Sequence, residues 1–294
     1  MKKLTAVFIT LFMSISLAAC SSSSNEGTNN NIEAENISSE NTSEKPKEAV
    51  IEEQVLFDDK NIKITAKSLE TSGSLFGPEL KLIIENNSNE NITVQANYVS
   101  VNGIMVENSL SSEVAAGKKA NDALTLYSSD LELAAIDTIK DIELIFNIFN
   151  TDTWDTITMS DKITITTSAT SYVQAYDDSG AVAIDENGIK IVIKKIDSED
   201  SFWGADVLVY IENNRDQDVT IQAQNVSING FMIDPIFSSD VLSGKKAYDT
   251  ITFMESDLEE NSITDIKDIE LSFHVFDLNS WDTIFDSQVV KISF

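Results

Sequence analysis

The sequence contains almost none of the residues that form covalent or metal-bound cross-links. Its 294 residues include one cysteine, Cys20, and one histidine, His274. A single cysteine excludes an intramolecular disulfide and any metal site built from several cysteines. We therefore predict no cofactor and no metal. The cores must be stabilised by apolar packing, for which 42% hydrophobic residues is ample.

Basic residues are scarce too. Lys and Arg number 20 against 49 Asp and Glu, which gives a formal net charge of −29. Because phosphate binding needs a basic face, this charge argues against nucleic acid as a partner. It also disfavours broad docking onto anionic lipid.

Residues 1–19 are predicted to be a signal peptide. Lys2 and Lys3 precede an apolar stretch that is too short for an ordinary membrane-spanning helix. The stretch ends in Leu17-Ala18-Ala19-Cys20, which resembles the lipobox of bacterial lipoproteins. That resemblance implies cleavage before Cys20 and acylation of Cys20, which would anchor the chain to the outer face of the cell membrane. The alternative is an uncleaved core helix with a chance cysteine.

Residues 20–54 are predicted to be a disordered acidic stalk. They are rich in Ser, Asn, Glu and Thr, with few apolar residues and one proline, Pro46. Such a composition cannot bury enough apolar surface to offset the entropy of ordering. A flexible chain of this length reaches roughly 30–35 Å, so we expect the stalk to act as a spacer.

An internal repeat organises the rest of the chain. Residues 57–167 (copy 1) align without a gap with residues 184–294 (copy 2), and about 46 of the 111 pairs are identical. Each copy is far longer than a solenoid unit and can hold its own core. We predict domain 1 at 55–167, a linker at 168–183 that either stays extended or packs between the domains, and domain 2 at 184–294.

Both copies alternate apolar and polar residues with a period of two. Residues 62–67 read Ile-Lys-Ile-Thr-Ala-Lys and residues 92–96 read Ile-Thr-Val-Gln-Ala, and the matching positions of copy 2 are similar. This alternation is typical of strands with one buried face. Asn102-Gly103 and Asn229-Gly230 each predict a two-residue hairpin turn.

One short helix is expected in each copy. Ser129-Asp130-Leu131-Glu132 and Ser256-Asp257-Leu258-Glu259 both match a capping box. Many short strands, frequent turns and almost no helix predict an all-β fold of two tandem immunoglobulin-like β-sandwich domains. The absence of a Cys–Trp–Cys pattern excludes an antibody-type domain.

The two copies resemble the immunoglobulin-like domains of unknown function that recur, often in tandem, in Gram-positive bacterial lipoproteins. The shared features are the repeat, the strand alternation and the lipobox at Cys20, which Ser21 rather than Asp follows. The resemblance implies a fold and an extracytoplasmic location. It assigns no active site.

No catalytic constellation is visible, and we predict that the protein is not an enzyme. His274 lies on the strand face opposite Phe273 and Val275, and its counterpart in copy 1 is Asn147, so we expect a surface residue. A Ser–His–Asp triad would lack a nucleophile motif. Paired carboxylates follow from the acidic composition and give no sign of a glycosidase cleft.

Two further features each have a binding and a structural interpretation. Residues 197–200 and 213–218 are rich in oxygen ligands for calcium, but neither is an EF-hand loop, and we expect solvated loops. Trp154 and Trp281 could stack on sugars, but we favour packing over the edge of a sandwich.

The most suggestive feature is a loop that occurs as Ser74-Leu75-Phe76-Gly77 and as Ser201-Phe202-Trp203-Gly204. Two adjacent large apolar residues cannot both face one core from a regular strand, so we expect at least one near a loop tip. Binding modules place anchors there. The alternative is a lid that closes one end of the sandwich. The predicted ligand-binding residues are Leu75, Phe76, Phe202 and Trp203.

The sequence thus predicts a non-enzymatic cell-surface lipoprotein that binds a surface protein, a peptide or a glycan, with two copies that supply reach or avidity. The alternative is a structural or accessory envelope lipoprotein that acts as a spacer without a ligand of its own. An enzyme ranks last.

Overall fold

The structure is a computed structural model that describes residues 49–72, 74–197 and 203–293. The predicted signal peptide, Cys20 and the predicted stalk up to residue 48 lie outside the described residues. The predicted end of the stalk at residue 54 is wrong: Ala49 is buried, Ile51 packs on the core of copy 1 and Gln54 begins a strand. Neither of the two helices that the structure describes is long and apolar enough to cross a membrane.

Copy 1 consists almost entirely of strands. Its elements are β1 (Gln54–Asp59), β2 (Ile62–Glu70), β3 (Glu79–Asn86), β4 (Ile92–Val101), β5 (Ile104–Met105), β6 (Asn108–Ser109), β7 (Ser111–Val114), β8 (Lys118–Leu126), α1 (Ser128–Leu133), β9 (Asp141–Asn150), β10 (Thr156–Met159) and β11 (Ile163–Thr166).

Copy 2 repeats this order of elements. Its elements are β12 (Ala181–Glu186), β13 (Ile189–Asp197), β14 (Gly204–Asn213), β15 (Val219–Ile228), β16 (Phe231–Met232), β17 (Ser238–Val241), β18 (Lys246–Met254), α2 (Glu255–Glu260), β19 (Asp268–Asp277), β20 (Thr283–Asp286) and β21 (Val290–Ser293). Strand β6 is matched only by an isolated bridge between Ile236 and Thr252.

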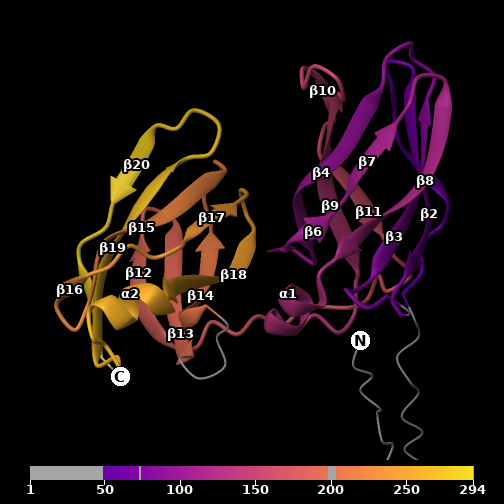
Figure 1. The fold of residues 1–294 in the computed structure, drawn as a ribbon. Coiled ribbons are helices and arrows are strands. Elements are labelled where there is room, and N and C mark those ends of the chain that lie inside the picture. The colour runs from indigo at the N-terminus through magenta and orange to yellow at the C-terminus, as the bar shows by residue number, and fades with distance from the viewer. Residues whose placement is uncertain (1–48, 73, 198–202, 294) are drawn as a thin grey trace, which may run out of the picture. The chain divides into compact units, whose positions relative to one another are not determined.

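In each copy the strands form two antiparallel layers (Figure 1). In copy 1 one layer has the order β1-β2-β3-β8-β6, and the other has the order β10-β9-β4-β5, with β7 beside β4 and β11 beside β9. In copy 2 the layers are β12-β13-β14-β18 and β16-β15-β19-β20, with β17 and β21 in the matching places. The prediction of an all-β sandwich is confirmed. The number of domains and their boundaries stay predictions.

The period-two alternation forms the core as predicted. The side chains of Ile62, Ile64 and Ala66 are buried, and Ile92 and Val94 meet them from the opposite layer. Copy 2 has a hydrophobic cluster of its own at the matching positions. Burial of branched side chains between two layers supplies the main stabilising free energy of such a fold.

A fully buried asparagine ties three segments of each copy together. The Asn86 side-chain amide donates to the carbonyls of Glu90 and Val114 at 2.8 and 2.9 Å, and its oxygen accepts from the Ser88 amide. Asn213 makes the same contacts in copy 2. A buried polar group is tolerated because its hydrogen bonds are made.

The local signals were partly correct. Asn102 and Gly103 have φ of 53° and 84°, as the predicted hairpin turn requires, and β4 pairs with β5 across them. The capping-box prediction is wrong, because α1 begins at Ser128 and its N-cap, Tyr127, makes no side-chain cap hydrogen bond. The Ser129 hydroxyl donates to the Asp130 carboxylate, and Ser129 lies inside the helix rather than at the N-cap, where its oxygen would accept from a backbone amide.

One edge strand of each copy pairs with the other copy. Strand β5 runs parallel to β18, with Ile104 opposite Lys246 and Met105 opposite Ala247, so one layer of copy 1 continues into one layer of copy 2. The Lys246 amide donates to the Gly103 carbonyl at 3.0 Å. Nearby, the Lys245 ammonium lies 2.7 Å from the Glu143 carboxylate. We call this pairing, together with the ion pair, the joint.

The ion pair of the joint is largely shielded from water. Burial raises the pKa of Glu143, but the ammonium groups of Lys245 and Lys162 outweigh this effect and keep the pKa below its ordinary value. A carboxyl with a lowered folded-state pKa stabilises the folded state above its unfolded-state pKa, and this contribution is lost as the pH falls. The joint is therefore favoured at neutral pH.

Replacing Asn86 by alanine tests whether the copies unfold separately. The substitution removes the donor of the carbonyls of Glu90 and Val114, of which the second bond is buried, so we expect the free energy of unfolding of copy 1 to fall by about 2 kcal/mol. Differential scanning calorimetry should then show a transition that moves to lower temperature and a second that stays. Asn213→Ala is the matched change in copy 2 and should move the other transition. One transition that shifts as a whole in both variants would contradict the two-domain prediction.

Candidate functional site

The apolar loop singled out in the sequence is exposed in both copies. Leu75 is 89% exposed and Phe76 is also exposed, in the loop between β2 and β3. Trp203 is exposed at the matching place in copy 2, whereas Phe202 lies outside the described residues. Exposure is what we expected of a loop tip. The role of these side chains as ligand-binding residues stays a prediction.

A glycine holds each loop against the neighbouring strand. Gly77 has φ of +144°, and a Cβ on it would lie 1.9 Å from the carbonyl oxygen of Leu126. The close approach therefore requires glycine. It allows the Ser128 amide, at the start of α1, to donate to the Phe76 carbonyl at 2.8 Å. Gly204 repeats the arrangement in copy 2.

Each copy also exposes a tryptophan in a hairpin, between β9 and β10 in copy 1 and between β19 and β20 in copy 2. Trp154 stacks on Phe149 and Trp281 stacks on Phe276, with ring centroids 5.4 and 5.5 Å apart. Both tryptophans have a positive φ, which is uncommon for a bulky residue. One face of each ring thus packs on the sheet, as favoured from the sequence, while the side chain stays exposed.

The remaining sequence candidates are structural. His274 lies on the outer side of its strand, and its Nδ1 is 2.6 Å from the Asp286 carboxylate. In the loop at 213–218 the first residue, Asn213, is the buried asparagine described above. Most of the other oxygen-rich loop, 198–200, lies outside the described residues. Among described residues, no three His, Cys, Asp or Glu side chains form a group that could hold a metal ion.

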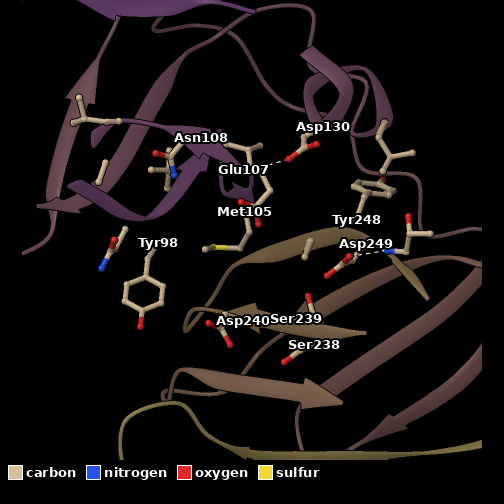
Figure 2. Close-up of a pocket in the computed structure, with 18 of the residues that line it drawn as sticks. Tyr98, Met105, Glu107, Asn108, Asp130, Ser238, Ser239, Asp240, Tyr248 and Asp249 are labelled. Atoms are coloured by element: carbon tan, nitrogen blue, oxygen red, sulfur yellow. Dashed lines mark hydrogen bonds between the residues drawn. The ribbon is translucent and has the colours of Figure 1, made fainter. Parts of the chain in front are cut away.

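A pocket of about 580 Å³ opens beside the joint, and both copies line it (Figure 2). Copy 1 contributes residues 95–99 of β4, the segment from β5 to residue 110, and α1. Copy 2 contributes residues of β17 and β18. The polar groups that converge on it are Tyr98, Glu107, Asn108, Asp130, Ser238, Ser239, Asp240, Tyr248 and Asp249. None of the exposed residues Leu75, Phe76 and Trp203 lines it.

The pocket carries four carboxyl groups, those of Glu107, Asp130, Asp240 and Asp249, and no Lys, Arg or His is among its described lining residues. The pKa of Asp249 is raised by burial and further by the carboxylates of Asp130 and Asp240. The pKa of Glu107 is raised for the same two reasons, although its side chain keeps contact with water. The acidic groups thus repel one another in a partly desolvated space.

These carboxylates are partly held by hydrogen bonds within the protein. Asp130 accepts from the Glu107 amide at 2.6 Å, and Asp240 accepts from the Thr220 hydroxyl at 2.6 Å. Asp249 accepts from the Thr250 amide at 2.7 Å. Each carboxylate is therefore fixed in direction, yet a carboxylate can accept about four hydrogen bonds, so acceptor capacity is left for a ligand.

Tyr98 occupies a strained position in the wall of the pocket. It lies in a bulge where the register of β4 against β9 shifts, and its φ is +53°. The bulge recurs in copy 2, where Asn225 takes φ of +54°. Asparagine tolerates this left-handed conformation, whereas tyrosine adopts it rarely. Strain of this kind is concentrated at functional sites.

The predicted linker packs against both copies. The buried Gln174 amide donates to the Ala135 carbonyl, and its oxygen accepts from the Asn102 side chain. The Tyr176 hydroxyl donates to the Asn102 carbonyl at 3.1 Å, and the Lys246 ammonium lies 4.6 Å from the centre of the Tyr176 ring. Of the two alternatives for residues 168–183, the described contacts favour packing.

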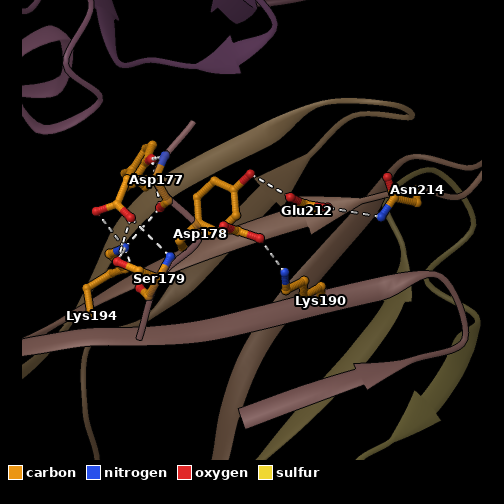
Figure 3. A network of polar contacts seen from close by, with 9 residues as sticks. Asp177, Asp178, Ser179, Lys190, Lys194, Glu212 and Asn214 are labelled. Carbon is orange, nitrogen blue, oxygen red and sulfur yellow. Dashed lines mark hydrogen bonds and ion pairs between the residues drawn. The ribbon is translucent and has the colours of Figure 1, made fainter. Parts of the chain in front are cut away.

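A polar network continues these contacts into copy 2 (Figure 3). Hydrogen bonds from Ser179 and Lys194 lower the pKa of Asp177 to about 2, and Asp178 pairs with Lys190 at 2.7 Å. The Tyr248 hydroxyl, which comes from the pocket wall, is within hydrogen-bond distance of the backbone of Asp177. The network therefore holds one wall of the pocket in place.

The sequence did not reveal the pocket, because residues more than 100 positions apart form it. One signal was visible in the sequence. In the alignment of the two copies, Tyr98 corresponds to Asn225. Asparagine tolerates the left-handed conformation, which a residue in a β-bulge can require. The acidic lining gave no signal in so acidic a chain.

Comparison of the sequence with protein-family models finds no match, and comparison with curated proteins finds none either.

Replacing Tyr98 by asparagine, the residue of copy 2, tests the strain. We expect the free energy of unfolding to rise by about 1 kcal/mol, because the left-handed conformation suits asparagine better. Urea denaturation measures the change. Asn225→Tyr is the reverse control and should be destabilising by a similar amount. A less stable Tyr98→Asn variant would show that packing of the ring outweighs the strain.

Asp249→Asn should make the protein more stable at pH 7 than the unsubstituted protein. Because the pKa of Asp249 is raised in the folded state, the folded state binds a proton more readily than the unfolded state, and stability increases as the pH falls through that pKa. The amide removes the charge that is unfavourable at neutral pH, so thermal unfolding should show a higher melting temperature at pH 7 and little change at pH 4. The exposed Asp122, at the matching position of copy 1, is the control, and a gain of the same size in Asp122→Asn would contradict the explanation.

Proposed function

We propose that this protein is an extracytoplasmic, lipid-anchored binding protein without enzymatic activity, and that its pocket receives a positively charged side chain of a peptide or protein. One observation carries the proposal: four carboxyl groups and a strained tyrosine converge in a cavity whose described lining contains no cationic residue.

The chemistry of the pocket matches an ammonium or guanidinium group. Such a group donates several hydrogen bonds to carboxylates and relieves the repulsion among them. The face of Tyr98 adds a cation–π interaction, which is stronger where water is excluded. A cavity of about 580 Å³ lies in the range of ligand sites and exceeds the needs of one small amine, which favours a segment of peptide.

The predicted anchor and stalk agree with this role. A lipid on Cys20 and a flexible stalk that ends before the buried Ala49 would hold the pocket at a distance from the membrane surface. Leu75, Phe76, Phe202 and Trp203 stay proposed apolar contacts for the same partner; the three of them that the structure describes, Leu75, Phe76 and Trp203, do not line the pocket. The alternative proposal, a spacer without a ligand, predicts that the pocket binds nothing selectively.

A labelled tetralysine peptide tests the proposal, with tetra(acetyl-lysine) as its uncharged counterpart. The protein is the chain from residue 20 with Cys20→Ser, and fluorescence anisotropy is measured at physiological salt, which screens distant charges. We expect Asp249→Asn to weaken binding of tetralysine about tenfold. Tyr98→Asn, which leaves the charge unchanged, should weaken it several-fold through loss of the cation–π contact.

A chain with a net charge of −29 attracts any polycation, so the control must change the charge equally. Asp122→Asn removes one negative charge at the matching position of copy 1, outside the pocket, and should leave affinity unchanged. If Asp122→Asn and Asp249→Asn weaken the binding of tetralysine equally, the binding is general electrostatic attraction only. The result would then favour the spacer proposal.

A further inference from the structure

The joint uses one edge of each copy and leaves the matching edges unpaired. Copy 1 contributes β5, whose counterpart in copy 2 is β16. Copy 2 contributes the start of β18, whose counterpart in copy 1 is the start of β8. In the part of the chain that the structure describes, β16 pairs with β15 alone, and residues 118–123 of β8 pair with β3 alone.

The unpaired edges carry the counterparts, in the repeat, of the residues that form the joint. The joint residues Gly103, Met105, Glu143, Lys245, Lys246 and Ala247 are matched, 127 positions away, by the identical residues Gly230, Met232, Glu270, Lys118, Lys119 and Ala120. Ile104 is matched by another apolar residue, Phe231. Both halves of the joint are therefore present on both copies, although the chain uses each half once.

The register of the free edge is also the same. Lys246 lies opposite Glu212 on β14, and Lys119 lies opposite Glu85 on β3, which is the matching pair. The Lys119 amide thus takes the orientation in which the Lys246 amide donates to Gly103. Lysines often protect edge strands against pairing, but here the same two lysines are accommodated inside the joint.

The strand edge that forms the joint is buried, whereas the matching edge of copy 2 is exposed. Ile104 is 0% exposed, whereas Phe231 at the matching position is 48% exposed and Met232 is 69% exposed. An edge strand with two exposed large apolar residues invites pairing with another chain.

We propose that β16 of one molecule pairs with the start of β8 of a second molecule, so that copies of this chain associate head to tail through a repetition of the joint. Glu270 of the first molecule then pairs with Lys118 of the second. Because the two surfaces differ, the contact does not close on itself as a symmetric dimer does, and it generates chains of molecules. The linker contacts of Tyr176 are absent from this interface, so it is weaker than the joint within the chain.

Engineered disulfides test the register of the contact. Met105 and Ala247 are direct partners in the joint, and their counterparts across molecules are Met232 and Ala120. In the chain from residue 20 with Cys20→Ser, Met232→Cys together with Ala120→Cys should give a ladder of covalent oligomers after oxidation, since paired strands bring Cα atoms within reach of a disulfide. Met105→Cys together with Ala247→Cys is the matched control, which should close within one molecule.

Three outcomes decide between the models. A ladder that extends beyond two chains supports the proposal. If the control closes while the test variant gives no oligomers, the proposal is wrong. If the test variant stops at two chains, or if Met232→Cys alone gives the same dimer, β16 pairs with β16 of its partner and the proposed head-to-tail contact is wrong.

A charge exchange tests the ion pair without cysteines. Sedimentation velocity of the same chain should show an average mass that rises with protein concentration. Glu270→Lys or Lys118→Glu alone should return the protein to monomers at each concentration, because like charges then meet. The double variant should regain association, and its failure to do so, with circular dichroism unchanged, would overturn the proposed pairing.

Discussion

The alignment of the two copies, and the pocket that both line, depend on two residues of β5 that pair with β18. The hydrogen bond from the Lys246 amide to Gly103 fixes the register between a layer of copy 1 and a layer of copy 2. A slip of one residue would turn the side chains to the opposite face. Met105 would then no longer lie opposite Ala247, and the residues that both copies contribute to the pocket would no longer meet as they do. The ion pair of Glu143 with Lys245, which is largely shielded from water, is a second contact between the copies that such a slip would disturb.

The pocket is built from features that disfavour folding. Carboxyl groups with raised pKa values repel one another, and Tyr98 has a conformation that its side chain rarely adopts. The hydrophobic clusters of the two copies offset these costs, since each buries many branched side chains between two layers. Under the proposed function, a positively charged ligand would neutralise these carboxylates, so a cost in stability of the unliganded protein is expected at such a site.

The sequence was sufficient for the layers and insufficient for their connection. Alternation at 62–67 and the turn at Asn102-Gly103 act over a few residues, so they predicted the sandwich and its hairpins correctly. The capping box failed because α1 begins at Ser128, which places Ser129 inside the first turn rather than at the N-cap. Pairing of β5 with β18 involves a strand of two residues and a partner more than 100 positions away, and so short an element has no pattern of its own. The acidic pocket follows from that pairing and was equally hidden.

The contacts between the copies fall into two groups with different consequences. The edge pairing and the ion pair use residues that both copies retain. The linker contacts use residues that are not duplicated: Tyr248, which bonds Asp177, is matched by Asn121, and Tyr210, which packs on Tyr248, is matched by Ile83. The first group is available to a second molecule and the second group is not. A contact between molecules would therefore have the geometry of the joint without the linker contacts that strengthen it, and its extent would depend on the local concentration of the protein.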